Sequence, residues 1–263
     1  MQILTSEAIV LDVIDLHEAD RIATFITRDA GRKRGVARGA KRRHSRFAGQ
    51  LRPLATLRLK WVEKDGQELV RISEAELLHS AHALQDDLEG LLLGSYLADH
   101  MMQFAQEFEE TDLYYRLLDS TLKALLAGVD RQTAARYFEA WVLRLSGIFP
   151  APEQCPECGA DLSAGAFLPP QSDSVVCRRC AQSGGGLGSG LAVTPEMVAW
   201  LRRISGESLT AIAAAPPQRI ALDGVEALCS AVRRGFLQHE LKSYRVMQET
   251  LGPSGLTPTT IGH

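Results

Sequence analysis

Short stretches of apolar and polar residues fill the first 80 positions and predict β-strands. Residues 7–14 and 21–27 are rich in aliphatic and β-branched side chains, and a polar turn at 17–20 separates them. An Asp-Ala-Gly turn at 29–31 leads into a third predicted strand at 32–38. The chain therefore begins with at least three strands joined by short turns.

Two more strands are predicted after residue 53. In residues 54–62 the apolar Leu57, Leu59 and Trp61 alternate with polar positions, as they do in a strand with one buried face. Asp65-Gly66 is a strong hairpin signal, and residues 67–73 are predicted to pair back. Five short strands without a long helix predict a small barrel. The OB architecture is a five-stranded barrel that binds charged strands, but periodicity does not separate it from an SH3-like barrel.

From about residue 82 the apolar spacing changes to the three and four residues typical of helices. Thr111 and Asp112 are suitable N-cap residues, Gly147 is a helix stop, and Pro195 is suited to a first helical turn. The predicted helices are 84–109, 113–127, 131–147, 195–204, 207–213 and 219–247. The apolar positions expected in the third and last of these are Phe138, Trp141, Val142 and Leu145, and Ala227, Val232, Phe236, Leu237 and Leu241.

The positive charge is concentrated in one stretch, residues 28–46. The whole chain has a net charge of −3, yet residues 1–80 carry about +4 and the remainder about −7. Such asymmetry points to a nucleic-acid or other acidic partner for the basic part. Gly31, Gly35 and Gly39 are expected to let the backbone turn and approach a ligand closely. The predicted DNA-binding residues are Arg32, Lys33, Arg34, Arg38, Lys41, Arg42, Arg43 and Arg46.

Four of the five cysteines form two C-x-x-C pairs, Cys155 with Cys158 and Cys177 with Cys180. Their separation matches the pattern of a zinc site, in which each pair directs two thiolates to one tetrahedral ion. Four cysteine ligands leave no open coordination position, so the sequence predicts one structural zinc per chain. The fifth, Cys229, lies within a predicted helix and is expected to be a core residue.

Neither a phosphate-binding G-x4-G-K-[ST] loop nor a G-x-S-x-G nucleophile motif occurs, so no catalytic residue is predicted and the protein is not expected to be an enzyme. Asp12, Asp15, Glu18 and Asp20 could bind magnesium in a nuclease, but a solvated strand end is the preferred interpretation. The N-terminus lacks the basic region of a signal peptide, and there is no apolar run long enough to span a membrane. We therefore expect a cytoplasmic protein that does not bind membranes.

Several segments together resemble one family. These segments occur in the order found in RecO, the bacterial recombination and repair mediator family. They are HEADRI, FITRDAGRKRGVARGAKRRHSRFAGQLRPL, ARYFEAWVLRLSGIFPAPEQCPECG and HELKSYRVM. The resemblance covers residues 1–247 and implies an α+β fold, with a five-stranded OB-fold barrel followed by an all-α helical domain with an inserted cysteine-rich zinc module. The predicted divisions are 1–80 for the barrel, 81–148 and 191–247 for the helical domain, 149–190 for the zinc module and Gly-rich linker, and 248–263 for a disordered tail.

The resemblance also implies a function and an association with the nucleoid. RecO proteins bind single- and double-stranded DNA, anneal complementary strands and, with RecR, help to load RecA on DNA coated by single-strand-binding protein (SSB). Arg136, in the pattern Arg136, Phe138 and Glu139, is a candidate contact for the acidic SSB tail, since a guanidinium suits carboxylates. Two other hypotheses remain open at this point: a metal-dependent nuclease that uses the N-terminal acids, and an RNA- or transcription-associated zinc-ribbon adaptor.

Overall fold

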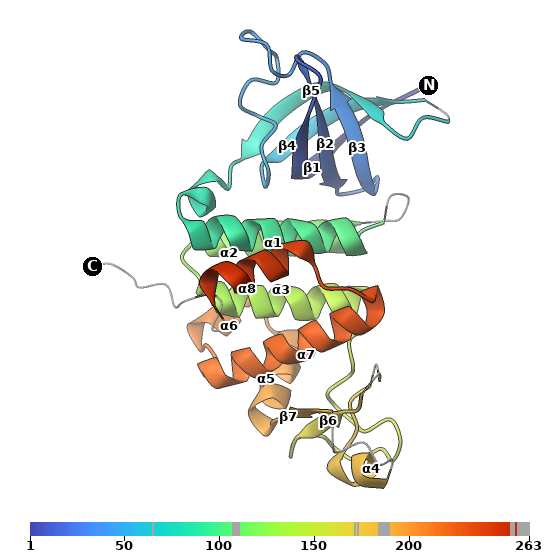
Figure 1. The fold of residues 1–263 in the computed structure, drawn as a ribbon, viewed down its shortest axis with the longest axis vertical. Helices are drawn as coiled ribbons and strands as arrows, with labels where there is room; N and C mark the ends of the chain where they lie inside the picture. The colour runs from blue at the N-terminus through green and yellow to red at the C-terminus, as the bar shows by residue number, and fades with distance from the viewer. Residues whose placement is uncertain are drawn as a thin grey trace, which may run out of the picture. The chain divides into compact units, whose positions relative to one another are not determined.

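The structure is a computed structural model that describes residues 1–64, 66–106, 111–170, 172, 174–183, 190–252 and 256. The chain divides into two compact units, Met1–Leu126 and Ala127–His263. The first unit holds the predicted barrel together with two helices, and the second holds the remaining helices and the cysteines (Figure 1). Asp65 of the predicted hairpin turn, most of the Gly-rich linker and most of the predicted tail lie outside the described residues.

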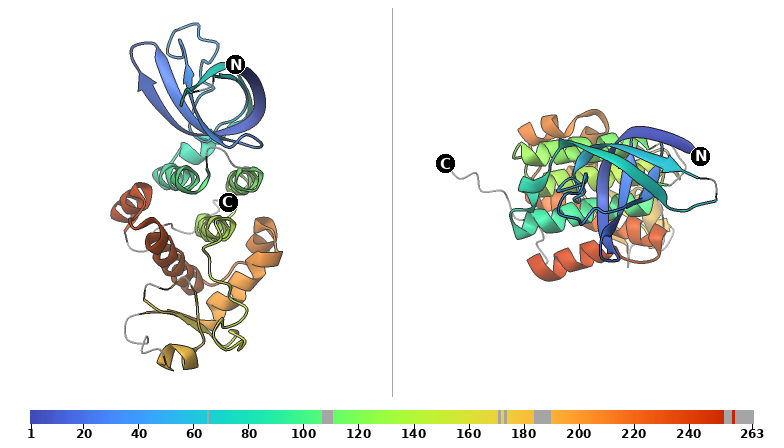
Figure 2. Two further views of the ribbon diagram at one scale, coloured as in Figure 1. Left: turned by 90° about the vertical axis from the view of Figure 1, so that its right-hand side faces the viewer. Right: turned by 90° about the horizontal axis from the view of Figure 1, so that it is seen from above.

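The first unit contains five strands: β1 Gln2–Leu16, β2 Asp20–Thr27, β3 Arg32–Ala37, β4 Thr56–Glu63 and β5 Val70–His79. They close into a barrel in the order β1-β2-β3-β5-β4, and the left view of Figure 2 shows the strands curving into a ring. Neighbouring strands are antiparallel except β3 and β5, which pair in parallel. This Greek-key order confirms the five-stranded OB barrel.

The strand β1 is longer than predicted because it takes part in both halves of the barrel. Its first half pairs with β4 and its second half with β2, and a β-bulge between Val10 and Asp12 marks the change of register. A bulge increases the local twist and bends the strand, which lets one strand serve both neighbours. Phe25 and Trp61 meet edge to face inside, with ring centroids 5.8 Å apart.

Gly35 has a packing role that its place in the basic run does not suggest. It lies buried in β3, where a Cβ atom would be 2.7 Å from Ile72 Cγ1 and 2.9 Å from Val70 Cγ2. Only a glycine leaves room for these β5 side chains. Packing against β5 thus accounts for Gly35 without a ligand, and its close approach to a ligand stays a prediction. Gly31 and Gly39 do form turns, with φ of 78° and 71°.

The substitution Gly35→Ala is expected to destabilise the protein by about 1–3 kcal/mol, because the added methyl group overpacks a filled core. Chemical denaturation monitored by tryptophan fluorescence would measure the change, since Trp61 lies in the same core. Gly235→Ala is the control, because a Cβ atom there meets nothing within 4 Å. Equal stability of the Gly35→Ala and wild-type proteins would contradict the packing role.

The connection between β3 and β4, residues 38–55, replaces a regular element with a series of turns. Its apolar side chains Phe47, Leu51 and Leu54 are each 2% exposed. Phe47 and Leu51 join the core of the barrel, and Leu54 packs against Gly94 of the first helix. The connection is therefore anchored by burial, while its basic residues remain outside.

Two helices, α1 Leu88–Phe104 and α2 Asp112–Leu126, follow the short 3-10 helix His82–Gln85 and pack beside the barrel. The predicted helix 84–109 is shorter than expected. Its end is set by Arg32, whose backbone N–H donates to the Gln106 carbonyl and whose Nε donates to the Ala105 carbonyl, both at 2.9 Å. Thr111 Oγ1 donates to the Thr27 carbonyl, which attaches the start of α2 to β2.

The second unit is built on the helices α3 Arg131–Leu145, α5 Pro195–Gly206, α6 Leu209–Ala214, α7 Arg219–Leu237 and α8 Lys242–Leu251. The short elements β6 Ala166–Leu168, α4 Arg178–Ser183 and β7 Leu191–Val193 lie with the cysteines. Asp130 and Thr194 cap α3 and α5 by accepting backbone N–H groups. Pro195 lies in the first turn of α5, as the sequence predicts. None of the described helices is long and apolar enough to cross a membrane.

The single helix predicted for 219–247 is wrong, because the chain breaks into α7 and α8. Gln238 adopts a left-handed conformation with φ of 62°. The Glu240 carboxylate then accepts hydrogen bonds from Arg233 Nη2 at 2.6 Å and from the Leu241 N–H at 2.9 Å. Arg233 is fully buried, so this carboxylate neutralises an interior charge and ends the helix at the same time.

Candidate nucleic-acid interface and metal centre

Residues 38–46, here called the basic loop, carry most of the exposed positive charge predicted to bind DNA. Arg38, Lys41, Arg42, Arg43 and Arg46 are all exposed. Arg34 is exposed on the neighbouring strand β3. Among the described residues, the guanidinium groups of Arg34, Arg38, Arg42 and Arg43 form no ion pair. Four cations without internal counter-charges make this surface suited to a polyanion.

Arg32 and Lys33 are placed differently from the rest of the predicted set. The side chain of Arg32 is committed to the Ala105 carbonyl, as described above. Lys33 Nζ lies 3.0 Å from Glu63 Oε1, and its side chain is only 14% exposed. Both residues therefore have structural partners in the barrel unit, and their contact with DNA stays a prediction.

Asp15 lies at the edge of the basic loop and pairs with two cations. Its carboxylate is 2.8 Å from Lys41 Nζ and 3.2 Å from Arg21 Nε. The hydrogen bond from Lys41 holds the pKa of Asp15 below its ordinary value, and Arg21 acts in the same direction. Lys41 is thus exposed and also paired with Asp15, whereas Arg42 and Arg43 are exposed without an ion pair among the described residues.

The four N-terminal acids do not gather around one point. Asp15 pairs with Lys41 and Arg21, whereas Asp20 Oδ1 accepts the Gly39 backbone N–H at 2.7 Å. Of the residues placed in the structure, the four C-x-x-C cysteines form the one cluster of three or more potential ligands that could hold a metal ion. The geometry therefore favours the interpretation of these acids as a strand end and turn.

The four cysteines converge from two turns of the chain. Their Sγ atoms all lie within 4.8 Å of one another, and those of Cys158 and Cys177 are 3.7 Å apart. A tetrahedral zinc ion with Zn–S bonds of about 2.3 Å requires sulfur atoms about 3.8 Å apart. The donor set and its spacing fit a tetrahedral metal ion with four thiolate ligands.

Backbone geometry prepares the first cysteine pair for thiolate ligation. The Gly159 N–H donates to the Cys155 carbonyl at 2.8 Å, and Gly159 has a φ of 70°, which closes a tight turn. A backbone hydrogen bond from Ala160, together with hydrogen bonds from the neighbouring thiols of Cys180 and Cys177, lowers the pKa of the Cys158 thiol to about 6. The same contacts raise the pKa of Cys180, because its thiol donates to Cys158 and Cys177. A bound cation would replace the proton that these thiols share.

The cysteine module is attached to α5 by one arginine. Arg202 Nη2 donates to the Glu153 carbonyl at 2.8 Å and lies 3.0 Å from Asp161 Oδ2. It also donates to the Pro152 carbonyl. These contacts place the first cysteine turn on a rigid helix, as a structural metal site requires.

Arg136, the candidate contact for an acidic tail, lies inside the second unit. Its side chain is 1% exposed and forms ion pairs with Glu226 at 2.6 Å and with Glu139 at 3.1 Å. Buried pairs of this kind link α3 to α7, and removal of one partner is costly. The structure thus gives Arg136 an internal role, and its predicted contact with a partner stays untested.

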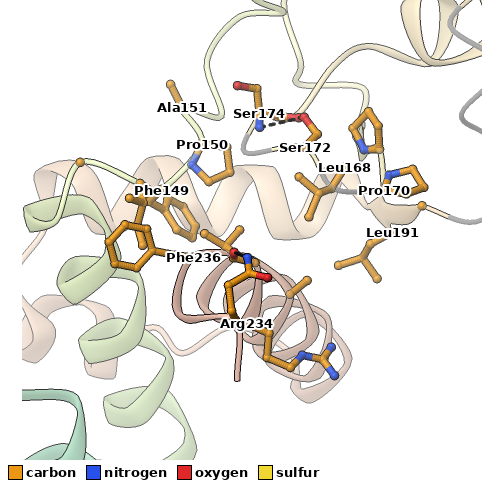
Figure 3. A pocket seen from close by; sticks show the side chains of 18 residues that line it. Phe149, Pro150, Ala151, Leu168, Pro170, Ser172, Ser174, Leu191, Arg234 and Phe236 are labelled. Atoms are coloured by element: carbon orange, nitrogen blue, oxygen red, sulfur yellow. Dashed lines mark hydrogen bonds between the residues drawn. The ribbon is translucent and has the colours of Figure 1, made fainter. Parts of the chain in front are cut away.

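A pocket of about 940 Å³ in the second unit was not found by sequence reasoning. Phe149 and Phe236 line one side, and Leu168 and Leu191 of the two short strands line another (Figure 3). Phe236 was predicted as a core position of a long helix, yet it is 56% exposed. The guanidinium of Arg234 extends from α7 at the rim. The apolar periodicity, interpreted as one long helix, contained no signal for this pocket.

Two family models match the chain. The model described as "Recombination protein O N terminal" matches residues 1–81, the part that forms the barrel. The model described as "Recombination protein O C terminal" matches residues 85–245, more than half of the chain. The chain belongs to the RecO family. The resemblance seen in the sequence segments is confirmed, and these segments lie in both units.

Bacterial relatives carry the name DNA repair protein RecO. The protein from Anaeromyxobacter sp. (strain K) is 30% identical over 89% of both chains. The protein from Koribacter versatilis is 34% identical over 65% of this chain and 70% of its own length, and that from Desulforudis audaxviator is 36% identical over 66% and 69%. The similarity therefore extends across both units and not only through the barrel.

Proposed function

We propose that this RecO family protein acts in DNA repair and recombination as a mediator that binds single- and double-stranded DNA and anneals complementary strands. The observation that carries the proposal is the basic loop on an OB barrel. Its exposed arginines lie within a short segment anchored at both ends by buried residues. Loops of an OB barrel are common binding places for nucleic acid.

The ligand contacts are proposed to be with phosphates more than with bases. The three Phe and Trp residues of the barrel, Phe25, Phe47 and Trp61, are at most 2% exposed. Buried rings are not available to stack on bases, which is a common way for OB barrels to hold single strands. Phosphate contacts are independent of sequence and leave base edges accessible for pairing, which suits a protein that anneals strands.

Two internal features support a binding role without catalysis. The four cysteines would hold a zinc ion with no open position, so the ion would stabilise the module and activate no water. Two of the four N-terminal acids, Asp15 and Asp20, have partners in the basic loop. We therefore propose ATP-independent annealing, in which neutralised phosphates allow two strands to approach and pair.

The partners proposed for this pathway are RecR, RecA and SSB. With RecR, the protein is proposed to assist RecA loading on SSB-coated DNA. The pocket lined by Phe149 and Phe236 is a suitable place for the SSB tail, because apolar side chains line it and the guanidinium of Arg234 at its rim suits carboxylates. Arg136 stays the candidate predicted from sequence, but its exposed surface is small.

The test is annealing of two complementary fluorescent oligonucleotides, measured by energy transfer with and without SSB. We expect the full chain to accelerate annealing without ATP, and to retain activity on SSB-coated strands. Failure to accelerate annealing, by a protein that is folded and contains zinc, would reject the proposed function. Magnesium-dependent cleavage would instead favour the nuclease hypothesis, and stronger competition by RNA than by DNA would favour the adaptor hypothesis.

A further inference from the structure

The start of the basic loop is bonded to the turn between β1 and β2. The Gly39 N–H donates to Asp20 Oδ1 at 2.7 Å, and the Lys41 N–H donates to the Ala19 carbonyl at 3.0 Å. Lys41 Nζ adds an ion pair with Asp15 on β1. Three contacts thus connect two segments that are about 20 residues apart in the chain.

The other end of the loop is held by apolar burial. Phe47, immediately after Arg46, is 2% exposed and belongs to the barrel core. Arg46 lies over the ring of Phe47, with its Cζ 5.0 Å from the ring centroid. Arg42 and Arg43 therefore extend from a segment that is fixed at both ends.

Of these contacts, the hydrogen bond to Asp20 is the one that joins a side chain to the backbone of the basic loop. Gly39 has a φ of 71°, a conformation that glycine adopts as one of several accessible states. A hydrogen bond from its N–H to a carboxylate is of the stronger, charge-assisted kind and selects one of these states. The bond therefore determines the direction in which the chain enters the basic loop.

We propose that Asp20 is a positioning residue for DNA binding, which holds the basic loop in the conformation that presents its arginines to phosphates. This inference rests on the proposed DNA-binding function. A loop ordered before binding loses less conformational entropy when it contacts the ligand, and this raises affinity. Ordering the loop raises the affinity for DNA, whereas the negative charge of Asp20 lowers this affinity, because a carboxylate near the DNA repels phosphates.

Two variants of Asp20 separate these effects. Asp20→Asn and Asp20→Ala remove the same negative charge, but the asparagine Oδ1 can still accept the Gly39 N–H. We expect Asp20→Asn to bind single-stranded DNA at least as tightly as the wild type. Asp20→Ala is expected to bind about three- to tenfold more weakly than Asp20→Asn, since the loop must be ordered on binding. Fluorescence anisotropy with a labelled oligonucleotide measures both affinities.

The salt dependence and a neighbouring carboxylate provide the controls. Neither variant removes a phosphate contact, so the slope of log affinity against log salt should be the same in both. Glu18→Ala removes an equal charge from the adjacent turn and should behave like Asp20→Asn. Equal affinities of the two Asp20 variants overturn the positioning role. If the wild type itself does not bind DNA, the proposed function fails and not only this inference.

Hydrogen exchange of the wild type tests the inference without a substitution. The amides of Gly39 and Lys41 are expected to be protected in the free full-length chain and to change little when DNA is added. Exchange at the rate of an unstructured chain, with protection only after DNA is bound, would show that the ligand orders the loop. That result would reject a positioning role for Asp20 even if the alanine variant proved unstable.

Discussion

Replacing Arg38, Arg42 and Arg43 together with alanine is expected to weaken single-stranded DNA binding by about 100-fold at 0.1 M salt. Each phosphate contact on a single strand contributes about 0.7 to the slope of log affinity against log salt, so three lost contacts lower the slope by about 2. The loss should be the same for all sequences, because phosphates carry no sequence information. Anisotropy titrations between about 0.05 and 0.3 M salt, the range over which such slopes are resolved, measure both quantities.

A matched control is available on other strands of the same barrel. Arg58, Lys60 and Arg71 lie on β4 and β5, and the first two pair with Glu76 and Glu74. Their joint replacement with alanine changes the net charge by the same amount but should leave the salt slope close to that of the wild type. If both triple variants lose affinity equally, net charge and not the basic loop determines binding. Unfolding measurements should show little change, since exposed charges contribute little to stability.

Loss of the metal site is expected to have the second large effect. Cys158→Ser combined with Cys177→Ser removes one thiolate from each pair, and the metal content should fall from about one zinc per chain to nearly zero. Structural zinc contributes on the order of 10 kcal/mol of apparent binding free energy to small modules, so the cysteine module should unfold locally. Elemental analysis and limited proteolysis would detect the two changes.

The fifth cysteine provides the control for this experiment. Cys229 is fully buried in α7, and burial raises the pKa of its thiol, as expected for a core residue. Cys229→Ala should retain the zinc. The barrel unit should remain folded in both variants, so that oligonucleotide binding through the basic loop persists. A double cysteine variant that keeps a full equivalent of zinc would refute the assignment of these ligands.

Features encoded in local patterns were predicted correctly from the sequence. The alternation around Leu57, Leu59 and Trp61 does mark strand β4, with all three side chains fully buried. The start of α5 follows from Pro195, which acts within the first turn of the helix. The cysteine spacing predicts a cluster because each C-x-x-C turn brings its own two thiols together. In the strand, in the helix start and within each cysteine pair, the cause and the result lie a few residues apart, whereas the meeting of the two pairs depends on the fold.

Features that depend on distant residues could not be predicted. Arg32 and Lys33 resemble the other cations of the basic run, yet Ala105 and Glu63 give them partners in the fold. Gly35 looks like a flexible position, but the side chains of β5 require it. The helix break after Leu237 is accompanied by a hydrogen bond from buried Arg233 to Glu240, a residue that the sequence pattern placed in the same helix. No periodic signal contains these contacts.

The sequence by itself therefore determined the barrel strands, the two cysteine pairs that could hold a metal ion and the location of the positive charge, because these are properties of short segments. The tertiary structure decided which cations remain available to a ligand and how the basic loop is held. Its anchors, Asp20 and Phe47, become effective only when the β1–β2 turn and the barrel core come close to residues 38–46. Charge density is a property of composition, whereas the presentation of charge depends on the conformation that non-local contacts select.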